Sequence, residues 1–473
     1  KGPTPVVEVS EEPVVDPEAV PAKRRKIYAP QMAPLHFPIL AGALKGLGWD
    51  VEVLPDVSPR AIELGLAHVN NDACYPAIVV IGQLLEVATA PDFDAEHSAL
   101  LLAQTCGPCR ATNYPGLLKW ALKDVGLEKL PVVCLSASSM HGVEHLELGL
   151  KGFHRLMIAL LYGDLLQRLT LHVRAYELER GSTEPLTQKW IARGREVSAR
   201  GDGAAFAHDA PQMVRDFLAL PMSREKKPRV GIVGEILLKY HPRANLDIVD
   251  EIINEGAEPV LGDITNFVIY CLNDNVYQAR SFGGSKIKGG FSWLLIKHYE
   301  SLRKPLLEAV RGTPVEGNMG LSQGLDDIRG FISEGQQAGE GWLLTAEMID
   351  FIRTGTPNVV CLQPFGCLPN HITGKGVMRR LRSDYPQANL CAIDFEAGTS
   401  KSNVANRLKL FIAQAKENFA QEQKRAEDEA DSNRSGGVSG TLGRRTIPIL
   451  ARKPDNDSAT VDGNRAAFAA TQI

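Results

Sequence analysis

This sequence of 473 residues has few of the features that mark specialised classes of protein. Eight cysteines are too few for a disulfide scaffold in a chain of this length, which favours a reducing compartment. The 52 basic and 56 acidic residues give a formal net charge of −4, without the basic excess of a nucleic-acid binder. The longest apolar stretches, such as Leu156–Tyr162, are far shorter than the ~20 residues that span a bilayer. We therefore expect a cytoplasmic protein with no membrane span and no nucleic-acid partner.

Phosphate-binding motifs are missing as well. The sequence has no Gly-x-x-x-x-Gly-Lys-Ser/Thr loop, and the pair Gly231 and Gly234 lacks the first glycine of a dinucleotide fingerprint. The glycine pairs at 283–284 and 289–290 are expected to form turns rather than phosphate cradles. The sequence thus predicts that any ATP used together with this chain is bound by a partner.

The two ends of the chain differ in composition from its middle. Residues 1–26 are rich in Glu, Val and Pro and end in a basic run, and residues 426–473 are rich in Asp, Ser, Asn and Gly without periodicity. Such segments bury too little apolar area to offset their ordering entropy, so both are expected to be flexible tails. Between them, short apolar runs alternate with helical patterns, which is typical of parallel βαβ units.

This alternation predicts an α/β fold with two Rossmann-like parallel-sheet domains joined by a helical segment. The first domain is expected over residues 27–145, the helical connector over 146–225 and the second domain over 226–425, closed by a long amphipathic helix. The expected strands are Lys26–Pro30, Val51–Leu54, Ser98–Gln104, Pro131–Leu135, Pro228–Gly234, Glu258–Leu261, Val359–Gln363 and Leu390–Asp394.

Several cysteines stand near the carboxyl ends of the expected strands, where ligands collect in parallel sheets. Most lie beside Gly, Pro or Asn at a junction between a loop and a helix, and a helix N-terminus favours a thiolate. Cys361 is ambiguous, because the interior of a strand favours packing while its closeness to Cys367 favours a site. The candidate metal ligands are Cys74, Cys106, Cys109, Cys271, Cys361 and Cys367. Cys134 and Cys391 have apolar neighbours within strands and are expected to be packing residues.

Three further features leave alternatives open. Cys106-Gly107-Pro108-Cys109 is also the dithiol sequence of thioredoxin-like oxidoreductases, although Thr105 stands where such sites carry Trp. His371, close to Cys367 in the sequence, is a candidate catalytic residue as a proton donor. Glu340 and Glu347 flank Trp342 at the start of an expected helix that either closes over a site or is an ordinary capped amphipathic helix.

Four stretches of the sequence carry a resemblance to a known family. They are Asn70–Ala77, Gln104–Tyr114, Gly339–Leu343 and Gln363–His371. In this order they resemble the C-terminal module of large CoA-substrate-specific enzyme activases. That module is related to the 2-hydroxyacyl-CoA dehydratase family and, more distantly, to double-cubane cluster proteins. The resemblance spans Lys26 to Phe419.

The resemblance implies an iron–sulfur protein of anaerobic metabolism. Carried over by motif, the ligands of a [4Fe-4S] cluster or of a double-cubane variant are Cys74, Cys109 and Cys367, with Cys271 and Cys361 as weaker candidates. The family is expected to have Gly-Gly-Gly-Cys where this chain has Cys-Gly-Pro-Cys, so Cys106 is either an extra ligand or a neutral substitution.

The resemblance also implies partners and an activity. A separate ATP-hydrolysing activase would supply low-potential electrons, and the chain would serve as the component that reduces or dehydrates a small-molecule or acyl-CoA substrate, within a homo- or hetero-oligomer. The alternative is a non-catalytic cluster carrier or maturation scaffold. A substrate-sized cavity beside the cluster, lined by His371, Asn370 or Glu347, would favour the enzyme, and a sealed site would favour the carrier.

Overall fold

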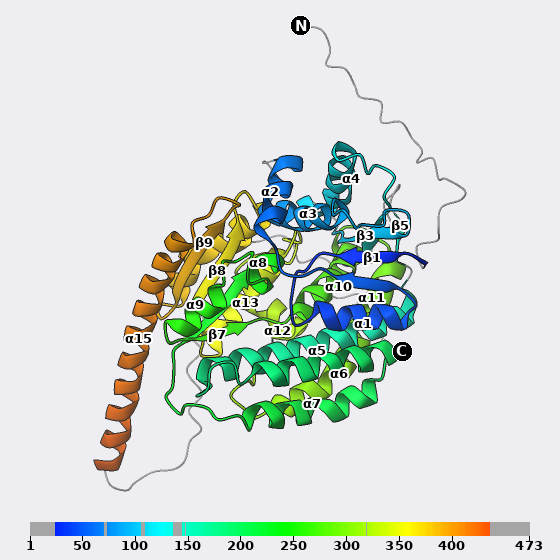
Figure 1. The fold of residues 1–473 in the computed structure, drawn as a ribbon. Coiled ribbons are helices and arrows are strands. Elements are labelled where there is room, and N and C mark those ends of the chain that lie inside the picture. Colours follow the sequence, from blue (N-terminus) through cyan, green and yellow to red (C-terminus); the bar gives the residue numbers. More distant parts are fainter. Residues whose placement is uncertain are drawn as a thin grey trace. The chain divides into compact units, whose positions relative to one another are not determined.

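The structure, a computed structural model, contains two parallel β-sheets with helices packed around them (Figure 1). It describes residues 24–70, 73–105, 109–135, 144–146, 148–317 and 319–435, with side chains as far as residue 428. The expected α/β fold with two Rossmann-like parallel-sheet domains is confirmed. The parts of the predicted tails at 1–23 and 436–473 lie outside the described residues.

The first sheet is made of five short strands. They are β1 (Lys26–Ala29), β2 (Asp50–Val53), β3 (Ser98–Ala103), β4 (Val132–Leu135) and β5 (Glu144–His145). Their order is β2-β1-β3-β4-β5, and all neighbouring pairs run parallel. The helices of this half are α1 (Phe37–Gly46), α2 (Pro59–His68), α3 (Tyr75–Ala88), the 3₁₀ helix η2 (Arg110–Asn113) and α4 (Tyr114–Asp124). Figure 1 shows α2, α3 and α4 on one side of the sheet and α1 on the other.

Helix α5 (Gly149–Tyr176) links the two halves. It packs against α1, against the following helices α6 (Glu184–Arg200) and α7 (Gly203–Leu218), and against strand β7 of the second sheet. Its length and composition would allow it to cross a membrane, and no other described helix meets this test. However, 94% of its most apolar window is buried inside the protein. The apolar character of α5 is therefore explained by neighbours on all sides.

The second sheet has four parallel strands in the order β7-β6-β8-β9. They are β6 (Arg229–Gly234), β7 (Glu258–Leu261), β8 (Asn358–Pro364) and β9 (Asn389–Phe395). The helices of this half are α8 (Ile236–Tyr240), α9 (Ile248–Asn254), α10 (Ile264–Ser281), α11 (Lys286–Val310), α12 (Leu321–Asp327), α13 (Gly341–Arg353), η3 (Asn370–Gly374), η4 (Lys375–Val377), α14 (Met378–Asp384) and α15 (Lys401–Ser435). All of β8 is buried, as expected for a central parallel strand with helices on both faces.

The end of β6 requires a glycine. Gly234 has a φ of +140°, and a Cβ there would come within 1.9 Å of the carbonyl oxygen of Leu362 on β8. The next residue, Glu235, donates its backbone N–H to the same oxygen at 3.1 Å. The close approach of the two strands therefore fixes Glu235 at the carboxyl end of the sheet.

All eight expected strands occur within a residue or two of their predicted bounds. The region between β7 and β8 differs from expectation, because helices α10 and α11 were not predicted. The turn expected at residues 289–290 was wrong, since both glycines lie inside α11. A Cβ on Gly289 would lie 2.7 Å from that of Ala279, so this glycine lets α10 and α11 pack closely. The turn at 283–284 is present, with Gly283 at a φ of +66°.

The closing helix α15 is longer than expected, since it continues to Ser435. Its first half belongs to the compact unit that ends at Ala420. Val404, Leu408 and Phe411 are buried there and pack into the core of the second half. Of the second unit, from Gln421 onward, only the end of this helix is described.

Candidate functional site

Three cysteines that the sequence singled out each stand directly before a turn of helix. Cys74 is the N-cap of α3, and Cys109 is the N-cap of η2, shortly after β3 ends. Cys367 follows β8, and its carbonyl oxygen accepts the backbone N–H of His371 at 3.0 Å, which begins the next helical turn. Both halves of the molecule therefore present a thiol at the same kind of position, beyond the sheets and at a helix start.

The backbone around each of these thiols is arranged to receive negative charge. The backbone N–H groups of Ala77, Ala111 and Asn370 each lower the pKa of the nearby thiol, that of Cys74, Cys109 and Cys367, respectively. Unpaired N–H groups at helix starts carry partial positive charge and stabilise thiolates.

Two glutamates lie near enough to the three thiols for their charges to act on them. The charge of Glu235 raises the pKa of all three thiols, and the charge of Glu340 raises that of Cys109 and Cys367. These five residues are called the thiol site below.

Gly339 marks the contact between the halves at this site. A Cβ on Gly339 would lie 2.9 Å from the ring of Pro369, and 4.0 Å from the Cys109 sulfur of the first half. The loops of the two halves thus meet directly, and there is little room between them.

The two glutamates of the thiol site are buried and held by neutral donors. Glu235 is the N-cap of α8 and accepts the backbone N–H of Leu238 at 3.0 Å. Glu340, at the start of α13, accepts the N–H of Ile236 at 3.3 Å and the side-chain amide of Asn370 at 2.9 Å. Burial, together with the charge of Glu340, raises the pKa of Glu235 to about 8. Burial also raises the pKa of Glu340.

The thiols themselves are also driven toward the protonated form. Burial is the largest cause for each of them, and it raises the pKa of Cys74 to about 11. It also raises the pKa of Cys109 and of Cys367. Cys74 exchanges a hydrogen bond with the Tyr114 hydroxyl at 3.0 Å, and Asn370 donates to the Cys367 sulfur at 3.2 Å.

No Lys, Arg or His in the described part of the chain forms an ion pair with Glu235 or Glu340. The site therefore gathers five acidic groups, and the nearby cation Lys239, which is ion-paired with Glu347, acts on Glu340 through its charge alone. Such a set either keeps its protons or binds a positively charged species from outside.

Three thiols are the kind of donor set that an iron–sulfur cluster takes. As the side chains stand, no three His, Cys, Asp or Glu residues among those described lie close enough together to hold one ion. A single ion needs every donor within about 2.3 Å of its centre, whereas a cluster takes one thiolate on each of several irons and so accepts thiols that stand further apart. The amide oxygen of Asn370 is buried without a described hydrogen-bond partner, which leaves a polar atom available beside Cys367.

The other cysteines of the sequence differ from these three in their positions. Cys106 lies outside the described residues. Cys271 is exposed on α10, where the sequence suggested the end of an apolar run. Cys361 is fully buried in β8 and packs in the core with Leu344 and Met348, and the charge of Glu340, after burial, raises its pKa as well. Cys134 is fully buried in β4, as expected for a packing residue, and Cys391 is partly buried in β9.

His371, the predicted proton donor, lies in η3. Its Nε2 atom is 3.8 Å from a carboxylate oxygen of Asp394, and its side chain is about one third exposed. The same carboxylate also pairs with Lys375 at 3.1 Å. His371 therefore lies on the outer side of the Cys367 loop, within reach of solvent.

Glu235 of the thiol site and Tyr114, the hydrogen-bond partner of Cys74, were not singled out from the sequence. Glu235 directly follows the apolar run that ends at Gly234, and a carboxylate at the end of a parallel strand is the signal that would have identified it. Tyr114 opens α4 and gave no such signal, because buried tyrosines are common in cores.

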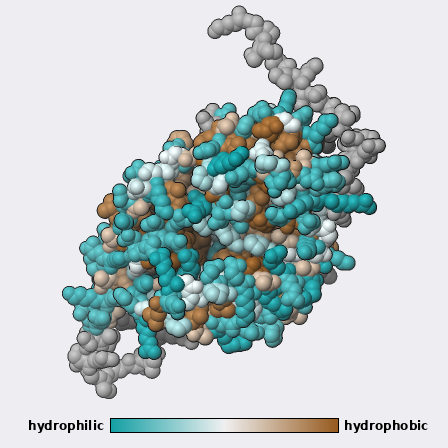
Figure 2. All heavy atoms as spheres, viewed as in Figure 1, coloured by the Kyte–Doolittle hydropathy of each residue, from teal (hydrophilic) through white to brown (hydrophobic). Residues whose placement is uncertain are grey.

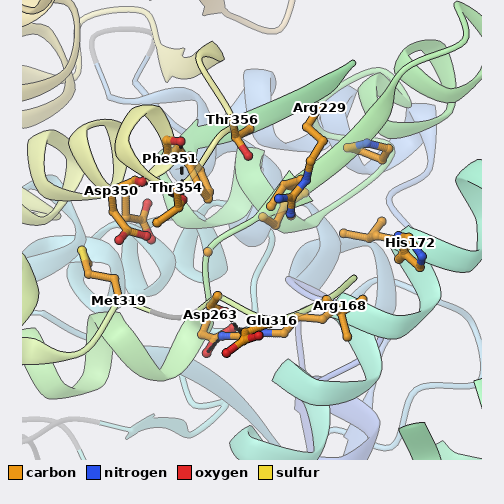
Figure 3. A pocket seen from close by; sticks show the side chains of 18 of the residues that line it. Arg168, His172, Arg229, Asp263, Glu316, Met319, Asp350, Phe351, Thr354 and Thr356 are labelled. Atoms are coloured by element: carbon orange, nitrogen blue, oxygen red, sulfur yellow. Dashed lines mark hydrogen bonds and ion pairs between the residues drawn. The ribbon is translucent and has the colours of Figure 1, made fainter. Parts of the chain in front are cut away.

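A separate cavity lies between β7, α5 and the end of α13 (Figure 3). Its volume is about 70 Å³, and Arg168, His172 and Arg229 project into it opposite acidic residues. Arg168 binds Asp263 through two hydrogen bonds of 2.8 and 2.6 Å, and His172 contacts Glu258 at 2.9 Å. A smaller cavity, lined by both Glu340 and Glu347, lies toward the thiol site.

No protein-family model and no curated protein sequence matches this chain. The resemblance to the activase and dehydratase families therefore stays a prediction.

Proposed function

We propose that this chain binds an iron–sulfur cluster through Cys74, Cys109 and Cys367 and handles single low-potential electrons. The observation that supports this is the convergence of three thiols, from both halves of the fold, with two buried glutamates and no cationic side chain paired to them. A cluster, when bound, supplies a one-electron redox centre whose potential depends on thiolate ligation, burial and hydrogen bonds to sulfur. Cys106 is proposed as a further ligand beside Cys109.

The chain's own residues would have three roles at such a site. The N–H groups of Ala77, Ala111 and Asn370 stabilise the thiolates once their protons have left. The amide of Asn370 bridges the Cys367 sulfur and Glu340, so it holds the Cys367 loop against α13. Burial excludes water from the sulfur atoms, which favours a low potential.

Glu235 is suited to hold and release a proton at this site. Its pKa of about 8 means that the carboxyl group carries a proton through much of the neutral range. A positive charge added nearby would lower that pKa and release the proton. Proton release from Glu235 would thus accompany loading of the site.

The electron donor and substrate follow from the family resemblance. An ATP-hydrolysing activase would deliver the electron, because a very low-potential centre cannot be reduced by ordinary cellular reductants: each ~59 mV uphill costs a factor of about ten. The substrate would be a small molecule or an acyl-CoA that is reduced or dehydrated. The isolated chain should therefore show no ATP hydrolysis.

The cavities favour a second candidate function, that of a non-catalytic cluster carrier. Glu347 lines the cavity of about 70 Å³, which is well below the several hundred Å³ of a typical small-molecule site. At the thiol site, a Cβ on Gly339 would lie 2.9 Å from the Pro369 ring and 4.0 Å from the Cys109 sulfur, so the described loops meet closely there. Stoichiometric transfer of the cluster to an apoprotein, without turnover of any acyl-CoA, would favour this function.

The test is anaerobic purification with iron and sulfide analysis and an EPR spectrum of the dithionite-reduced protein. We expect about four irons per chain and a cluster signal. Cys74→Ser, Cys109→Ser and Cys367→Ser should each lose most of the iron, while Cys134→Ser, at a buried thiol in β4, is the matched control and should retain it. Iron content that is unchanged in all three site variants would contradict the assignment.

A further inference from the structure

The hairpin of α10 and α11 carries an unusual concentration of exposed apolar side chains. Most of the surface in Figure 2 is hydrophilic, with apolar residues in small patches. Over residues 282–294, by contrast, five large apolar side chains are between 49% and 86% exposed. They are called the apolar ridge and are Phe282, Ile287, Phe291, Trp293 and Leu294.

The ridge lies on the outward face of α11. Ile287, Phe291 and Leu294 are spaced by four and then three residues, which places them on one side of a helix. The opposite side of the same helix is buried and includes Ile296 and Tyr299. Phe282 extends the ridge into the turn before α11, where Gly283 adopts a φ of +66°.

Lysines flank the ridge. Lys286, Lys288 and Lys297 are exposed, and among the described residues none forms an ion pair with a carboxylate. The Lys297 ammonium lies 5.5 Å from the centre of the Trp293 ring, so it stays at the ridge. The nearest acid on the helix, Glu300, pairs with Arg303 at 3.6 Å. The local charge is therefore positive around an apolar centre.

We propose that this ridge docks on an anionic lipid surface, as a peripheral site on α11 and the turn before it. An amphipathic helix with Ile, Phe and Leu on its outer face, and with Trp and lysines on its flanks, is suited to the boundary between headgroups and acyl chains. The lysines supply attraction to acidic lipids, and the apolar side chains supply insertion. The ligand is the headgroup and outer acyl region of an anionic phospholipid bilayer.

Charge and shape argue for this occupant over a second copy of the chain. Two ridges facing one another would bring three unpaired lysines against three more, and like charges oppose association. None of the five side chains of the ridge lines a described cavity, so the structure describes no groove there that a partner's side chains could fill. A lipid interface deforms around exposed side chains and needs no matching groove.

The experiment is co-sedimentation of the full chain with vesicles of phosphatidylcholine alone or with phosphatidylglycerol. We expect binding only to vesicles that contain phosphatidylglycerol, and loss of binding as salt rises from about 0.05 to about 0.5 M. Lys286→Gln, Lys288→Gln and Lys297→Gln combined should weaken binding about 100-fold, since each lysine near such a surface contributes about five-fold.

Ile287→Ser, Phe291→Ser and Leu294→Ser combined should weaken binding at least about 10-fold. These side chains are exposed, so the fold should persist, and circular dichroism would check this. Trp120→Ser, at an exposed apolar residue of α4, is the matched control and should leave binding unchanged.

Failure of the full chain to bind phosphatidylglycerol vesicles would overturn the proposal, and so would binding that neither combined variant reduces. A dimer in analytical ultracentrifugation that the serine variant dissolves would assign the ridge to a second copy instead. If the full chain bound an immobilised acidic protein but no vesicles, the apolar ridge would be assigned to a protein partner.

Discussion

Buried acidic groups occur in two regions of this protein, and the two regions differ in what stands beside them. Where α5 and α13 meet β7 and α8, Asp263 is bound by Arg168 at 2.8 and 2.6 Å, and Glu347 is bound by Lys239 at 2.7 Å. At the thiol site, Glu235 and Glu340 receive only backbone N–H groups and the amide of Asn370.

This difference separates structure from function. A buried carboxylate with a well-aligned cation is satisfied within the fold, and it holds neighbouring elements together. Buried acids without a cation keep their protons, at a cost to the charged form, unless something positive is supplied. The first region is thus explained by packing alone. In the second, neither Glu235 nor Glu340 is hydrogen-bonded to a cation, although the charge of Lys239 acts on Glu340, and we propose that a bound ligand supplies the positive charge. The proposed cluster site rests on that contrast.

The largest loss of stability is expected from removing one partner of a buried ion pair. Lys239→Met would leave Glu347 buried without its partner and should lower the free energy of unfolding by about 3–5 kcal/mol. The double variant Lys239→Met, Glu347→Met should recover much of this loss, because no uncompensated charge remains. Urea unfolding monitored by circular dichroism measures both. If the single variant were as stable as the native protein, the ion pair of Lys239 and Glu347 would not stabilise the fold as its geometry indicates.

The buried acids of the thiol site should make the stability of the metal-free protein depend on pH. The pKa of Glu235 is about 8 in the folded state against an ordinary value of 4.5, so the folded chain holds a proton that the unfolded chain has released between these values. The stability contribution of Glu235 is therefore fully present below pH 4.5 and falls as the pH rises from 4.5 toward 8.

Glu235→Gln should flatten this dependence. Unfolding midpoints of the metal-free native protein and of the variant, measured between pH 5 and pH 9, give the comparison. If the unfolding midpoints of the two proteins changed with pH in the same way, Glu235 would be charged in the folded protein without loss of stability. The thiol site would then not differ from the region of paired buried acids.

Cysteines buried in strands provide a sharper test of which thiols belong to the site. Cys134→Ala and Cys361→Ala remove a sulfur atom from the core and should cost about 1 kcal/mol of stability. Both variants, and Cys391→Ala, are expected to keep the iron content of the native protein. Loss of iron from Cys361→Ala would extend the thiol site into β8 and restore that residue as a ligand.

The smallest effect is expected at an exposed pair. Lys401 and Asp247 are 2.9 Å apart at the surface, with Lys401 about half exposed. Lys401→Met should change the free energy of unfolding by less than about 1 kcal/mol, because solvent screens such pairs. A loss as large as that of Lys239→Met would show that burial is not what separates strong from weak pairs in this protein.

The sequence by itself determined the two α/β halves and the positions of the three thiols. Runs such as Ser98–Ala103 and Asn358–Pro364 are apolar on both faces, which only a central parallel strand requires, so β3 and β8 were predictable. Cys74, Cys109 and Cys367 were predictable as candidates because each stands at a junction between a loop and a helix.

Only the tertiary structure decided what surrounds those thiols. Glu235 and Cys74 are far apart in the chain, and no local pattern shows that they act on one another. The same holds for α11, whose glycines at 289 and 290 suggested a turn, although one of them serves to bring α10 close. Local propensity and periodicity report what a segment prefers alone, whereas charge convergence and close helix packing depend on which distant segments the fold brings together.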